Sequence, residues 1–497
     1  MTTVLSIYHD VLKGFNEIRR KKSLDTLTDN QLIRQEVKDL ILSKEQIHQW
    51  MEVFDKYCDD GLKKHTKNEG VLPMLPTFVC SVPNGTEVGD FLALDLGGTN
   101  FRVLLIQLDG KKAKMNGKIF RVPETIMKGS GEALFDHIVD CMAKFLGEHG
   151  FPNAKQLPLG FTFSFPCRQE GLTKGTLMQW KKGFNASGVE GQDVVTLLRE
   201  ACARRKHRQL AEDADVVLDI DVVALLNDGV GTLMTCAFND NNCQMGVIVG
   251  TGTNACYMEK MKNIEKVAAI DEDHDEMIIN TEWGSFGNDG AMDFIRTEWD
   301  HQVDRESLFP GRGVYEKMLS GMYLGEIVRV VLEHLARKEL LFSGHYKAIS
   351  QQGCFPTKFL SEIELEHLTD EEETYHKTSQ ILEDIGIPNV TKSDCINVAY
   401  VCQLVTARAA HITAAGIASL LNRMNRSKVT VGIDGSVYRF HPTFGAILDQ
   451  KVGELIDQNL KYKLMLSEDG SGKGAALVAA VATRLKMDKT KNNSLPN

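Results

Sequence analysis

A short run of glycine and polar residues separates two apolar stretches near residue 100. Residues 97–100 read Gly-Gly-Thr-Asn, and Arg102 follows two positions later. Glycine lets backbone amides approach a ligand closely, and the threonine, asparagine and arginine side chains add hydrogen-bond donors. This combination is suited to binding phosphate groups. An ordinary tight turn is the alternative, because a glycine-rich turn between strands is more often structural than functional.

A second copy of this pattern favours the phosphate interpretation. Residues 246–260 read GVIVGTGTNACYMEK, again with a glycine-threonine turn between apolar stretches. The tripeptide Gly-Thr-Asn ends both turns, at residues 98–100 and 252–254. Two such turns facing each other across a cleft would hold the phosphates of one nucleotide between them. Neither turn leads into Gly-Lys-Ser/Thr and a helix, and neither has G-x-G-x-x-G before a helix, which excludes a P-loop and a dinucleotide fingerprint.

Polar residues also follow other apolar stretches, where α/β proteins place their ligands. Ser164 lies near the end of one such stretch, residues 180–184 (WKKGF) contain two lysines, and Asn227 and Asp228 end another. A carboxylate at such a position is either a helix cap or a site residue. Beside a nucleotide, Asp228 becomes a candidate general base, because phosphoryl transfer needs a carboxylate that accepts the proton of the acceptor hydroxyl.

The elements that position these residues follow from hydrophobic periodicity. Apolar runs at residues 91–96 and 101–108 flank the first turn and predict a β-hairpin. The spacing over residues 131–145 predicts an amphipathic helix, and residues 157–165 and 219–226 predict buried strands.

The second half of the chain is predominantly helical. Helices are predicted at residues 315–337, 378–385 and 396–423, a strand at 429–433, and a glycine-rich turn at 468–473 that opens a helix of small residues. Strands alternate with helices in two blocks, and each block begins with a hairpin. This order predicts an α/β protein of two related domains.

The composition is that of an ordinary soluble protein. The 497 residues are 43% hydrophobic and 25% charged, enough for about two or three domains with sizeable cores. The net charge of -10 argues against nucleic acid as a partner, because phosphate backbones require a basic surface. The basic run at residues 201–208 predicts a solvated helix end rather than a docking patch.

Cysteine and histidine usage indicates neither a disulfide framework nor a zinc site. The 11 cysteines are scattered without C-x-x-C pairs, and the 14 histidines lack H-x-x-x-H spacing. No signal sequence and no membrane-spanning run is recognisable, so we expect reduced thiols and a cytoplasmic protein.

Nine segments resemble the eukaryotic hexokinase family, both in their residues and in their order along the chain: FLALDLGGTNFRVLL, LGFTFSFPC, LMQWKKGF, NDGVGTLM, VGTGTNACYME, NTEWGSFG, YEKMLSGMYLGEIVR, VGIDGSVYRFHP and SEDGSGKGAALVAAV. The resemblance covers roughly residues 72–485. It implies the actin-like ATPase fold, which is ribonuclease H-like, with two related domains around a cleft. It also implies a single-unit chain, which we expect to be a monomer.

The resemblance implies a site for ATP and a site for a hexose. The implied ATP-binding residues are Asp95, Gly97, Gly98, Thr99, Asn100, Arg102, Thr251, Gly435 and Ser436. Mg²⁺ would be held nearby, largely through water and without a dedicated protein ligand set. The implied sugar-binding residues are Ser164, Lys182, Asn227, Asp228, Asn254, Glu282 and Glu316. Asp228 would be the catalytic base, and Lys182 would lie near both substrates.

The resemblance also implies domain boundaries. The small domain would comprise residues 78–228 plus 464–485, and the large domain residues 15–77 plus 229–463. Residues 486–497 would form a disordered tail.

Three positions depart from the family pattern at or beside the sugar site. Lys181 and Gly229 stand where the family has threonine, and Gly313 stands where glutamine usually precedes Tyr-Glu-Lys by two residues. Lysine accepts no hydrogen bond and glycine has no side chain, so hydroxyl groups of the sugar lose partners. Two such losses, at about 1–3 kcal/mol each, lower kcat/KM by about two to four powers of ten.

The sequence therefore predicts a hexokinase that phosphorylates a glucose-like hexose to the hexose 6-phosphate in glycolysis, with reduced or altered sugar affinity. The alternative is a hexokinase-derived sugar- or nucleotide-binding protein with little catalytic activity. The reason to consider it is the departure from the family pattern at Lys181, Gly229 and Gly313. An actin-like or chaperone-like ATPase is a third possibility, but it does not explain the sugar-site residues as a set.

Overall fold

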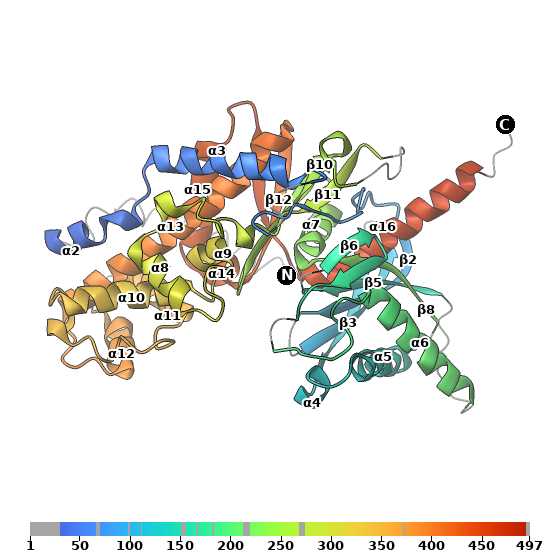
Figure 1. Ribbon diagram of the computed structural model, residues 1–497, viewed down its shortest axis with the longest axis horizontal. Coiled ribbons are helices and arrows are strands. Elements are labelled where there is room, and N and C mark those ends of the chain that lie inside the picture. Colours follow the sequence, from blue (N-terminus) through green and yellow to red (C-terminus); the bar gives the residue numbers. More distant parts are fainter. Residues whose placement is uncertain are drawn as a thin grey trace.

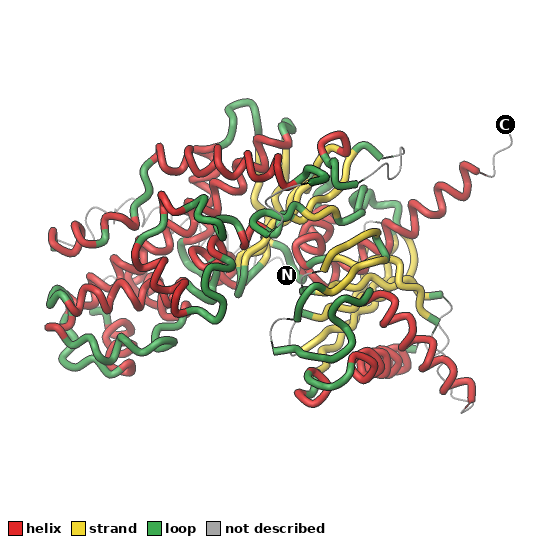
Figure 2. The backbone as a smooth tube through the Cα atoms, viewed as in Figure 1, coloured by secondary structure: helices red, strands yellow, loops and turns green. Residues whose placement is uncertain are grey.

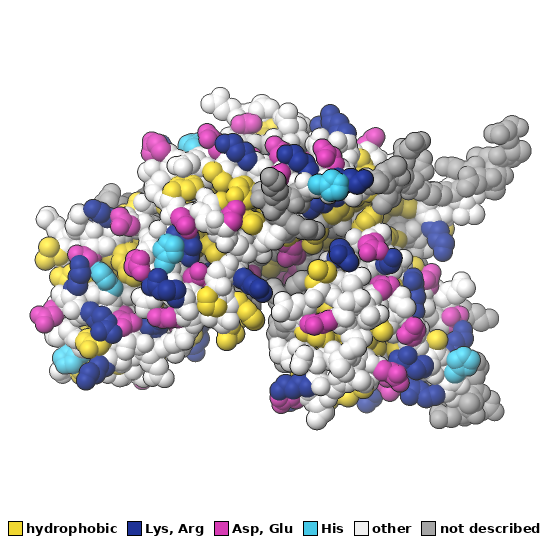
Figure 3. Space-filling model, viewed as in Figure 1, with side chains coloured by type: hydrophobic (Ala, Val, Ile, Leu, Met, Phe, Trp, Pro, Cys, Tyr) yellow, Lys and Arg dark blue, Asp and Glu magenta, His cyan; other side chains and the backbone are white. Residues whose placement is uncertain are grey.

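The computed structural model describes residues 30–65, 70–97, 100–110, 112–150, 156–165, 167–180, 183–211, 219–267, 274–370, 372 and 374–493. They form two domains, each built around one β-sheet (Figure 1). The strands of both sheets lie in the middle and right of the molecule, and most helices of the large domain lie to the left (Figure 2). A notch separates the two domains on the face shown in Figure 3.

Five strands form the sheet of the small domain, in the spatial order β4 (Lys112–Arg121), β3 (Asn100–Asp109), β2 (Val88–Leu96), β5 (Leu157–Phe163) and β8 (Ile220–Leu226). β2, β3 and β4 are antiparallel neighbours, whereas β5 and β8 run parallel to β2. Alternate residues of β2 face opposite sides, because side chains alternate along a strand. Leu92 and Leu94 face α5 (Gly131–Glu148) and α6 (Val194–Ala211), and Phe91 and Ala93 face α16 (Gly470–Asn493).

Six strands form the sheet of the large domain, in the order β1 (Leu75–Pro76), β11 (Glu276–Asn280), β10 (Thr253–Lys260), β9 (Cys243–Val249), β12 (Lys428–Asp434) and β13 (Lys461–Leu466). β9, β12 and β13 are parallel, and β1, β10 and β11 add antiparallel pairs. One face packs on the large helical core, and the other face packs on α7 (Asp228–Asn239).

The core of the large domain is organised around α13 (Lys392–Met424). It packs against α3 (Lys44–Gly61), α10 (Leu324–Arg337) and α15 (Phe444–Leu455). By length and composition α13 is apolar enough to cross a membrane, but 94% of its most apolar window is buried inside the protein. Among the residues described, it is the one helix that passes this test, and its burial marks it as a core helix.

The remaining helices and strands are α2 (Gln31–Glu36), η2 (Lys38–Leu40), α4 (Glu124–Met127), β6 (Cys167–Gly171), β7 (Lys174–Leu177), η3 (Met261–Asn263), η4 (Trp283–Ser285), η5 (Asp293–Ile295), α8 (Glu298–Glu306), α9 (Val314–Leu319), η6 (Phe342–Gly344), α11 (Thr357–Thr369), α12 (His376–Ile385) and α14 (Ser436–Phe440).

The helices α7 and α16 lie between the two sheets and contact each other closely. A Cβ atom at Gly474 of α16 would lie 2.2 Å from the backbone of Gly231 in α7, and one at Gly160 of β5 would lie 1.9 Å from the Ala475 carbonyl oxygen. On the other side, a Cβ at Gly246 of β9 would lie 2.4 Å from the backbone of α7. Glycine at these positions therefore permits a backbone approach that any side chain would prevent.

Both predicted hairpins are confirmed as the pairs β2–β3 and β9–β10. The helix predicted over residues 315–337 is wrong as a single helix, because the structure has two helices there, α9 and α10, separated at residues 320–323. The predicted turn at residues 468–473 is also shorter than expected, since α16 already begins at Gly470. The basic run on α6 is largely neutralised, since Arg204 and Arg205 pair with Asp136 and Asp140 of α5.

Two predicted boundaries need correction. The boundary at residue 464 falls inside β13, which pairs along its whole length with β12 of the large domain. The predicted disordered tail is wrong for residues 486–493, because α16 continues to Asn493. Residues 486–491 (KMDKTK) include good helix formers and no glycine or proline, so nothing in that segment ends the helix. Residues 15–29 and 494–497 lie outside the described residues.

Replacing Gly160 with alanine tests the close packing of α16 on β5. We expect Gly160→Ala to lower the free energy of unfolding by about 3 kcal/mol, because the new methyl group overlaps the Ala475 carbonyl. Gly171→Ala is the control, since a Cβ there meets no described atom within 4 Å, and it should change stability by less than about 1 kcal/mol. Urea denaturation measures both, and equal effects would contradict the packing argument.

Candidate functional site

The carboxyl ends of three parallel strands meet at one edge of the small-domain sheet. Leu96 of β2 is opposite Phe163 of β5, and Thr162 is opposite Leu226 of β8. The residues just beyond these ends are therefore neighbours. The amide of Ser164 donates to the Leu96 carbonyl at 3.1 Å.

The first glycine turn packs against Ser164. The hydroxyl oxygen of Ser164 lies 3.5 Å from the point where a Cβ at Gly97 would sit, and Asp95 Oδ1 lies 3.9 Å from the same point. The turn, the serine and the aspartate thus form one polar corner at the end of β2. Asp95 and Ser164 are half-buried, so both can face a ligand without full desolvation.

Asn227 and Asp228 begin α7. The Asn227 side chain caps the helix and accepts from the Gly229 amide at 2.8 Å, and Asp228 Oδ1 accepts from the same amide at 2.9 Å. A carboxylate in the first turn of a helix is stabilised by the exposed amides and the helix dipole. The fold thus holds Asp228 half-buried at the end of a rigid helix.

The Asn254 side chain is the centre of a polar network. Its Nδ2 lies 2.8 Å from Asn280 Oδ1, 3.2 Å from Glu282 Oε1 and 3.3 Å from Asn227 Oδ1. Asn280 Nδ2 also donates to Glu282 Oε1 at 2.8 Å. The network therefore joins the cap of α7 to the ends of β10 and β11.

Glu282 takes a strained backbone conformation. Its φ of 52° and ψ of 40° lie in the left-handed region, which costs a residue other than glycine about 1–3 kcal/mol. The amides of Asn254 and Asn280 hold its carboxylate. Strain of this kind clusters at functional sites.

Glu316 reaches the second glycine turn from α9. Its Oε2 accepts from the Thr253 amide at 3.0 Å. The carboxylate lies directly over Gly252, where a Cβ would come within 2.5 Å of Oε2. Only glycine at position 252 leaves room for the carboxylate.

A cleft lies beside this network, with apolar walls and a polar end. Phe163, Phe165 and Cys167 line the apolar part, and Asn227, Asn280 and Glu282 line the polar part. Amides and carboxylates on one side of a hydrophobic cleft can recognise a molecule with adjacent hydroxyl groups, each both donor and acceptor.

Cys167 is not a nucleophile in this cleft. Burial raises the pKa of its thiol to about 12, and the negative charges of Asp193 and Glu282 act in the same direction. At neutral pH the side chain is a thiol, and the reactive form of cysteine is the thiolate.

The second glycine turn packs against two other loops. Gly435 follows β12 with φ of 115°, and a Cβ there would lie 2.3 Å from the Val249 carbonyl oxygen. Gly321 donates its amide to the Gly250 carbonyl at 2.7 Å, and the Met322 amide lies 3.3 Å from the Thr251 carbonyl oxygen.

A groove of about 350 Å³ opens beside this turn. Leu308, Gly321, Met322, Pro356 and Thr357 are among the residues that line it. The Leu308 and Met322 side chains are largely exposed, so the groove offers apolar surface to a ligand.

The beginning of α16 connects the two turns. Arg102, just beyond the first turn, pairs with Asp469. The next residue, Gly470, donates its amide to Asp434 Oδ2 at 3.3 Å, and Asp434 precedes Gly435 at the second turn. Both turns therefore border the same helix end.

The structure brings together most of the predicted site residues. Of the sugar-side set, Asn227 and Glu282 line the cleft, and Asn254 contacts both of them. Three further members lie next in sequence to a lining residue or, through one contact, beside Asn254: Ser164, Asp228 and Glu316. The nucleotide-side residues Asp95, Gly97, Asn100 and Arg102 lie at the first turn, and Thr251, Gly435 and Ser436 at the second. Gly98, Thr99, Lys182 and the divergent Lys181 lie outside the described residues.

Sequence reasoning missed Asn280 and the groove residues. Asn280 ends an apolar strand two residues before Glu282, and a polar residue at a strand end was a usable signal. Gly321, Met322 and Thr357 carried no comparable signal, because they approach the second turn only through the tertiary fold.

Comparison with known proteins gives consistent matches along the chain. Two hexokinase family profiles match, one over residues 32–238 and the other over residues 244–481. Hexokinase HKDC1 of Mus musculus is 49% identical over 455 residues, which is 90% of this chain and 47% of that protein. Hexokinase-1 of Homo sapiens is 48% identical over 462 residues, 91% of this chain and 47% of that protein. The chain spans about half the length of these curated relatives.

Two solved structures can be superimposed on this protein over their entire length. A hexokinase from Schistosoma mansoni complexed with glucose is 41% identical, with a TM-score of 0.79 over 91% of this chain and 100% of that chain. A second hexokinase crystal structure is 29% identical, with a TM-score of 0.78 over 92% and 100%. These matches confirm the predicted α/β, actin-like ATPase fold.

Removing the Asn280 amide tests whether the network holds Glu282 for a ligand. Asn280→Ala should weaken the binding of a ligand with adjacent hydroxyl groups, for which glucose is the probe, about 10- to 100-fold, because a lost buried hydrogen bond costs about 1–3 kcal/mol. Asn263→Ala is the matched control, since Asn263 also donates to a carboxylate, Glu259 at 2.7 Å, but away from the cleft. Calorimetric titration with glucose measures both variants. Equal weakening by the two would show that the network has no particular role in binding.

Proposed function

We propose, because this chain belongs to the hexokinase family, that it transfers the terminal phosphate of ATP to a hydroxyl of a glucose-like hexose. The observation that carries the proposal is the Asn254 network beside Asp228. It places amides and carboxylates at the polar end of a cleft, next to a carboxylate at a helix terminus.

The chemistry of the cleft supports a sugar as the acceptor. Asn227 and Asn254 offer both donors and acceptors, and Glu282 and Glu316 offer acceptors only. A hexose presents hydroxyl groups that can satisfy both kinds. Each group is supported by a second contact, which orients it before the substrate arrives.

Asp228 is the candidate general base. Its Oδ1 already accepts from the Gly229 amide, so the carboxylate has a fixed orientation at the end of α7. In the proposed reaction it accepts the proton of the attacking hydroxyl as that oxygen bonds to the terminal phosphorus and the bond to the ADP oxygen breaks.

The two glycine turns are candidates for binding the phosphates. Arg102 and the backbone amides of the turns would balance their charge, and the groove beside Gly321 has the apolar lining that suits a nucleotide base. The carboxylate of Asp95, beside the first turn, is an oxygen donor that fits Mg²⁺ held mainly through water. Mg²⁺ would neutralise phosphate charge.

The two described departures from the family pattern differ in kind. At Gly229 a Cβ would meet Asn227 Oδ1 at 3.3 Å and Cys256 Sγ at 3.9 Å, so a threonine fits with a small adjustment. Gly313 has φ of 68°, in the left-handed region. Its glycine is part of the loop conformation, and restoring glutamine there would strain the backbone.

A coupled assay with MgATP and glucose, fructose or mannose tests the proposed activity. Asp228→Asn should lower kcat about 10²- to 10⁴-fold, because it removes a general base and preserves the shape of the side chain. Asp221→Asn, on β8 outside the cleft, is the control and should retain activity. Absence of turnover with all three hexoses at saturating ATP would contradict the proposed kinase activity. It would favour the alternative, a sugar- or nucleotide-binding protein with little catalytic activity.

Replacing glycine with the residue typical of the family should improve catalysis at position 229 but reduce stability at position 313. Gly229→Thr should raise kcat/KM for glucose about tenfold, since one regained hydrogen bond contributes about 1 kcal/mol or more. Gly313→Gln should instead lower the free energy of unfolding by about 1–2 kcal/mol. Steady-state kinetics and urea denaturation of both variants distinguish these effects. An unchanged kcat/KM for Gly229→Thr would show that water or another group already serves that hydroxyl.

A further inference from the structure

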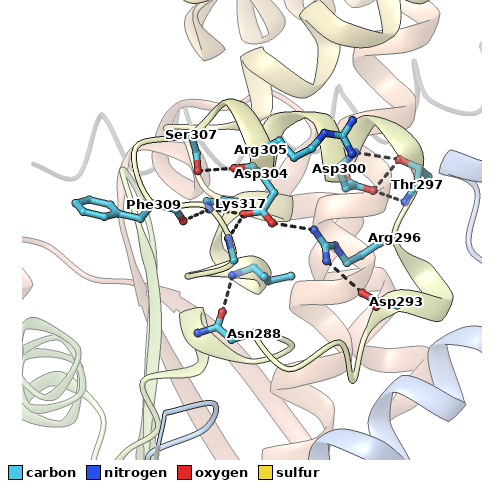
Figure 4. Close-up of polar contacts among 12 residues, drawn as sticks. Asn288, Asp293, Arg296, Thr297, Asp300, Asp304, Arg305, Ser307, Phe309 and Lys317 are labelled. Atoms are coloured by element: carbon cyan, nitrogen blue, oxygen red, sulfur yellow. Dashed lines mark hydrogen bonds and ion pairs between the residues drawn. The ribbon is translucent and has the colours of Figure 1, made fainter.

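A second group of charged residues lies behind the sugar side of the site, without belonging to it. Lys317, Asp304, Arg296, Asp300 and Arg408 come from α8, α9, α13 and the segment before α8, and most of them are drawn in Figure 4. The Lys317 side chain is 5% exposed and that of Asp304 is 14% exposed. Charged groups are rarely buried to this extent unless they are paired.

Lys317 makes two hydrogen bonds that bind α9 to its surroundings. Its Nζ donates to Asp304 Oδ1 at 2.6 Å and to the Phe309 carbonyl at 2.8 Å (Figure 4). The first contact holds α9 against α8. The second holds it against the loop of residues 307–313, which leads into α9 itself.

The Asp304 carboxylate accepts hydrogen bonds from three separate parts of the chain. In addition to Lys317, its carboxylate accepts from the Gly311 amide at 3.0 Å and from Arg296 at 3.3 Å. Burial raises the pKa of Asp304, but the hydrogen bonds from Lys317 and Gly311 and the two positive charges outweigh it, so the pKa lies below its usual value. The carboxylate is therefore ionised throughout the neutral range.

The helix that carries Asp304 is itself fixed to the core of the large domain. Asp300 of α8 accepts two hydrogen bonds from Arg408 of α13, at 2.6 and 2.7 Å, and both side chains are almost fully buried. Asp300 also completes a capping box with Thr297. α8 is thus a rigid support that extends from α13 to Lys317.

α9 needs such a support because it is short. It spans six residues, Val314–Leu319, and Gly313 at its N-cap position has no side chain to cap it. A helix of this length is not stable alone, since nucleation is unfavourable and few hydrogen bonds follow. Its position depends on contacts from outside, and Lys317 is next in sequence to the sugar-side residue Glu316.

We propose that Asp304 and Lys317 are a positioning pair, which sets where the Glu316 carboxylate lies in the sugar half of the cleft. The inference rests on the proposed hexose kinase function and deepens it. Neither residue lines the cleft described above; they act through α9. Because the Glu316 carboxylate fits between the Thr253 amide and Gly252, a small shift of α9 would remove it from this place. A misplacement of about 1 Å can cost about 10²-fold in activity.

Lys317→Met removes both hydrogen bonds and keeps a side chain of similar length. We expect it to raise KM for glucose about tenfold or more and KM for ATP much less, because Glu316, the residue next to Lys317, belongs to the sugar side of the site. Asp304→Asn is the conservative variant, since an amide oxygen can still accept from Lys317 and Gly311, and it should raise KM for glucose less than Lys317→Met.

Arg423→Met is the matched control for the loss of a partly buried cation. Arg423 donates to Glu259 at 2.6 Å, away from the cleft, and its side chain is 15% exposed. We expect this variant to lower Tm and leave KM for glucose unchanged. Steady-state kinetics with each substrate varied, calorimetric glucose titration and thermal unfolding are measured for all variants.

The outcomes are separable. If Lys317→Met lowers Tm as Arg423→Met does but leaves KM and Kd for glucose unchanged, or if both KM values rise together, the positioning role is overturned. If Lys317→Met does not fold, the same measurements are made on Asp304→Asn. An unchanged KM for glucose in that variant would overturn the positioning role. Absence of hexose phosphorylation by the wild-type protein would contradict the proposed function instead, while glucose titration of the variants still tests the pair.

Discussion

α7 and α16 lie so close to each other and to both sheets that a side chain larger than hydrogen is excluded at several contacts. Gly160, Gly246 and Gly474 each face backbone atoms at distances where a methyl group would overlap them. The two helices therefore act as a thin connecting layer between the domains. Everything at the cleft depends on this layer, because α7 begins at Asp228 and α16 begins between the two glycine turns.

The site follows from where parallel strands end. In each sheet the carboxyl ends of three parallel strands meet at one edge, and the polar residues after them become neighbours although they are far apart in sequence. Asn254 then ties the ends of β10, β11 and β8 together through one amide group. A buried polar network of this kind is stable only when its members are satisfied, so it also fixes their positions. The recognition groups are consequently rigid before any ligand arrives.

Much of this was accessible from the sequence, and the limits have physical reasons. The hairpins were predictable because their strands alternate regularly and their turns contain glycine, which are local signals. The Lys317–Asp304 pair was not predictable, because its members meet only through tertiary packing. Asn280 did carry a signal, a polar residue at the end of an apolar strand, which sequence reasoning missed. The left-handed turn at Gly313 was interpreted only as a missing side chain, since the sequence does not show φ. The continuation of α16 was missed because a polar, lysine-rich end looks the same in a helix and in a disordered tail.

The place of α16 in the chain has a consequence for how the protein is made. The last strand of the small-domain sheet ends at Leu226 and α16 begins at Gly470, so residues 227–469, which are 243 residues, separate them. At about 5–20 residues per second, a ribosome needs roughly 12–50 seconds to synthesise that interval. During this time the face of the sheet that includes Phe91 and Ala93 has no covering helix. Of the two large sheets, the small-domain sheet is the first whose strands are all synthesised, yet the domain is among the last parts to be completed, and until then the sheet exposes an apolar surface of the kind that chaperones bind.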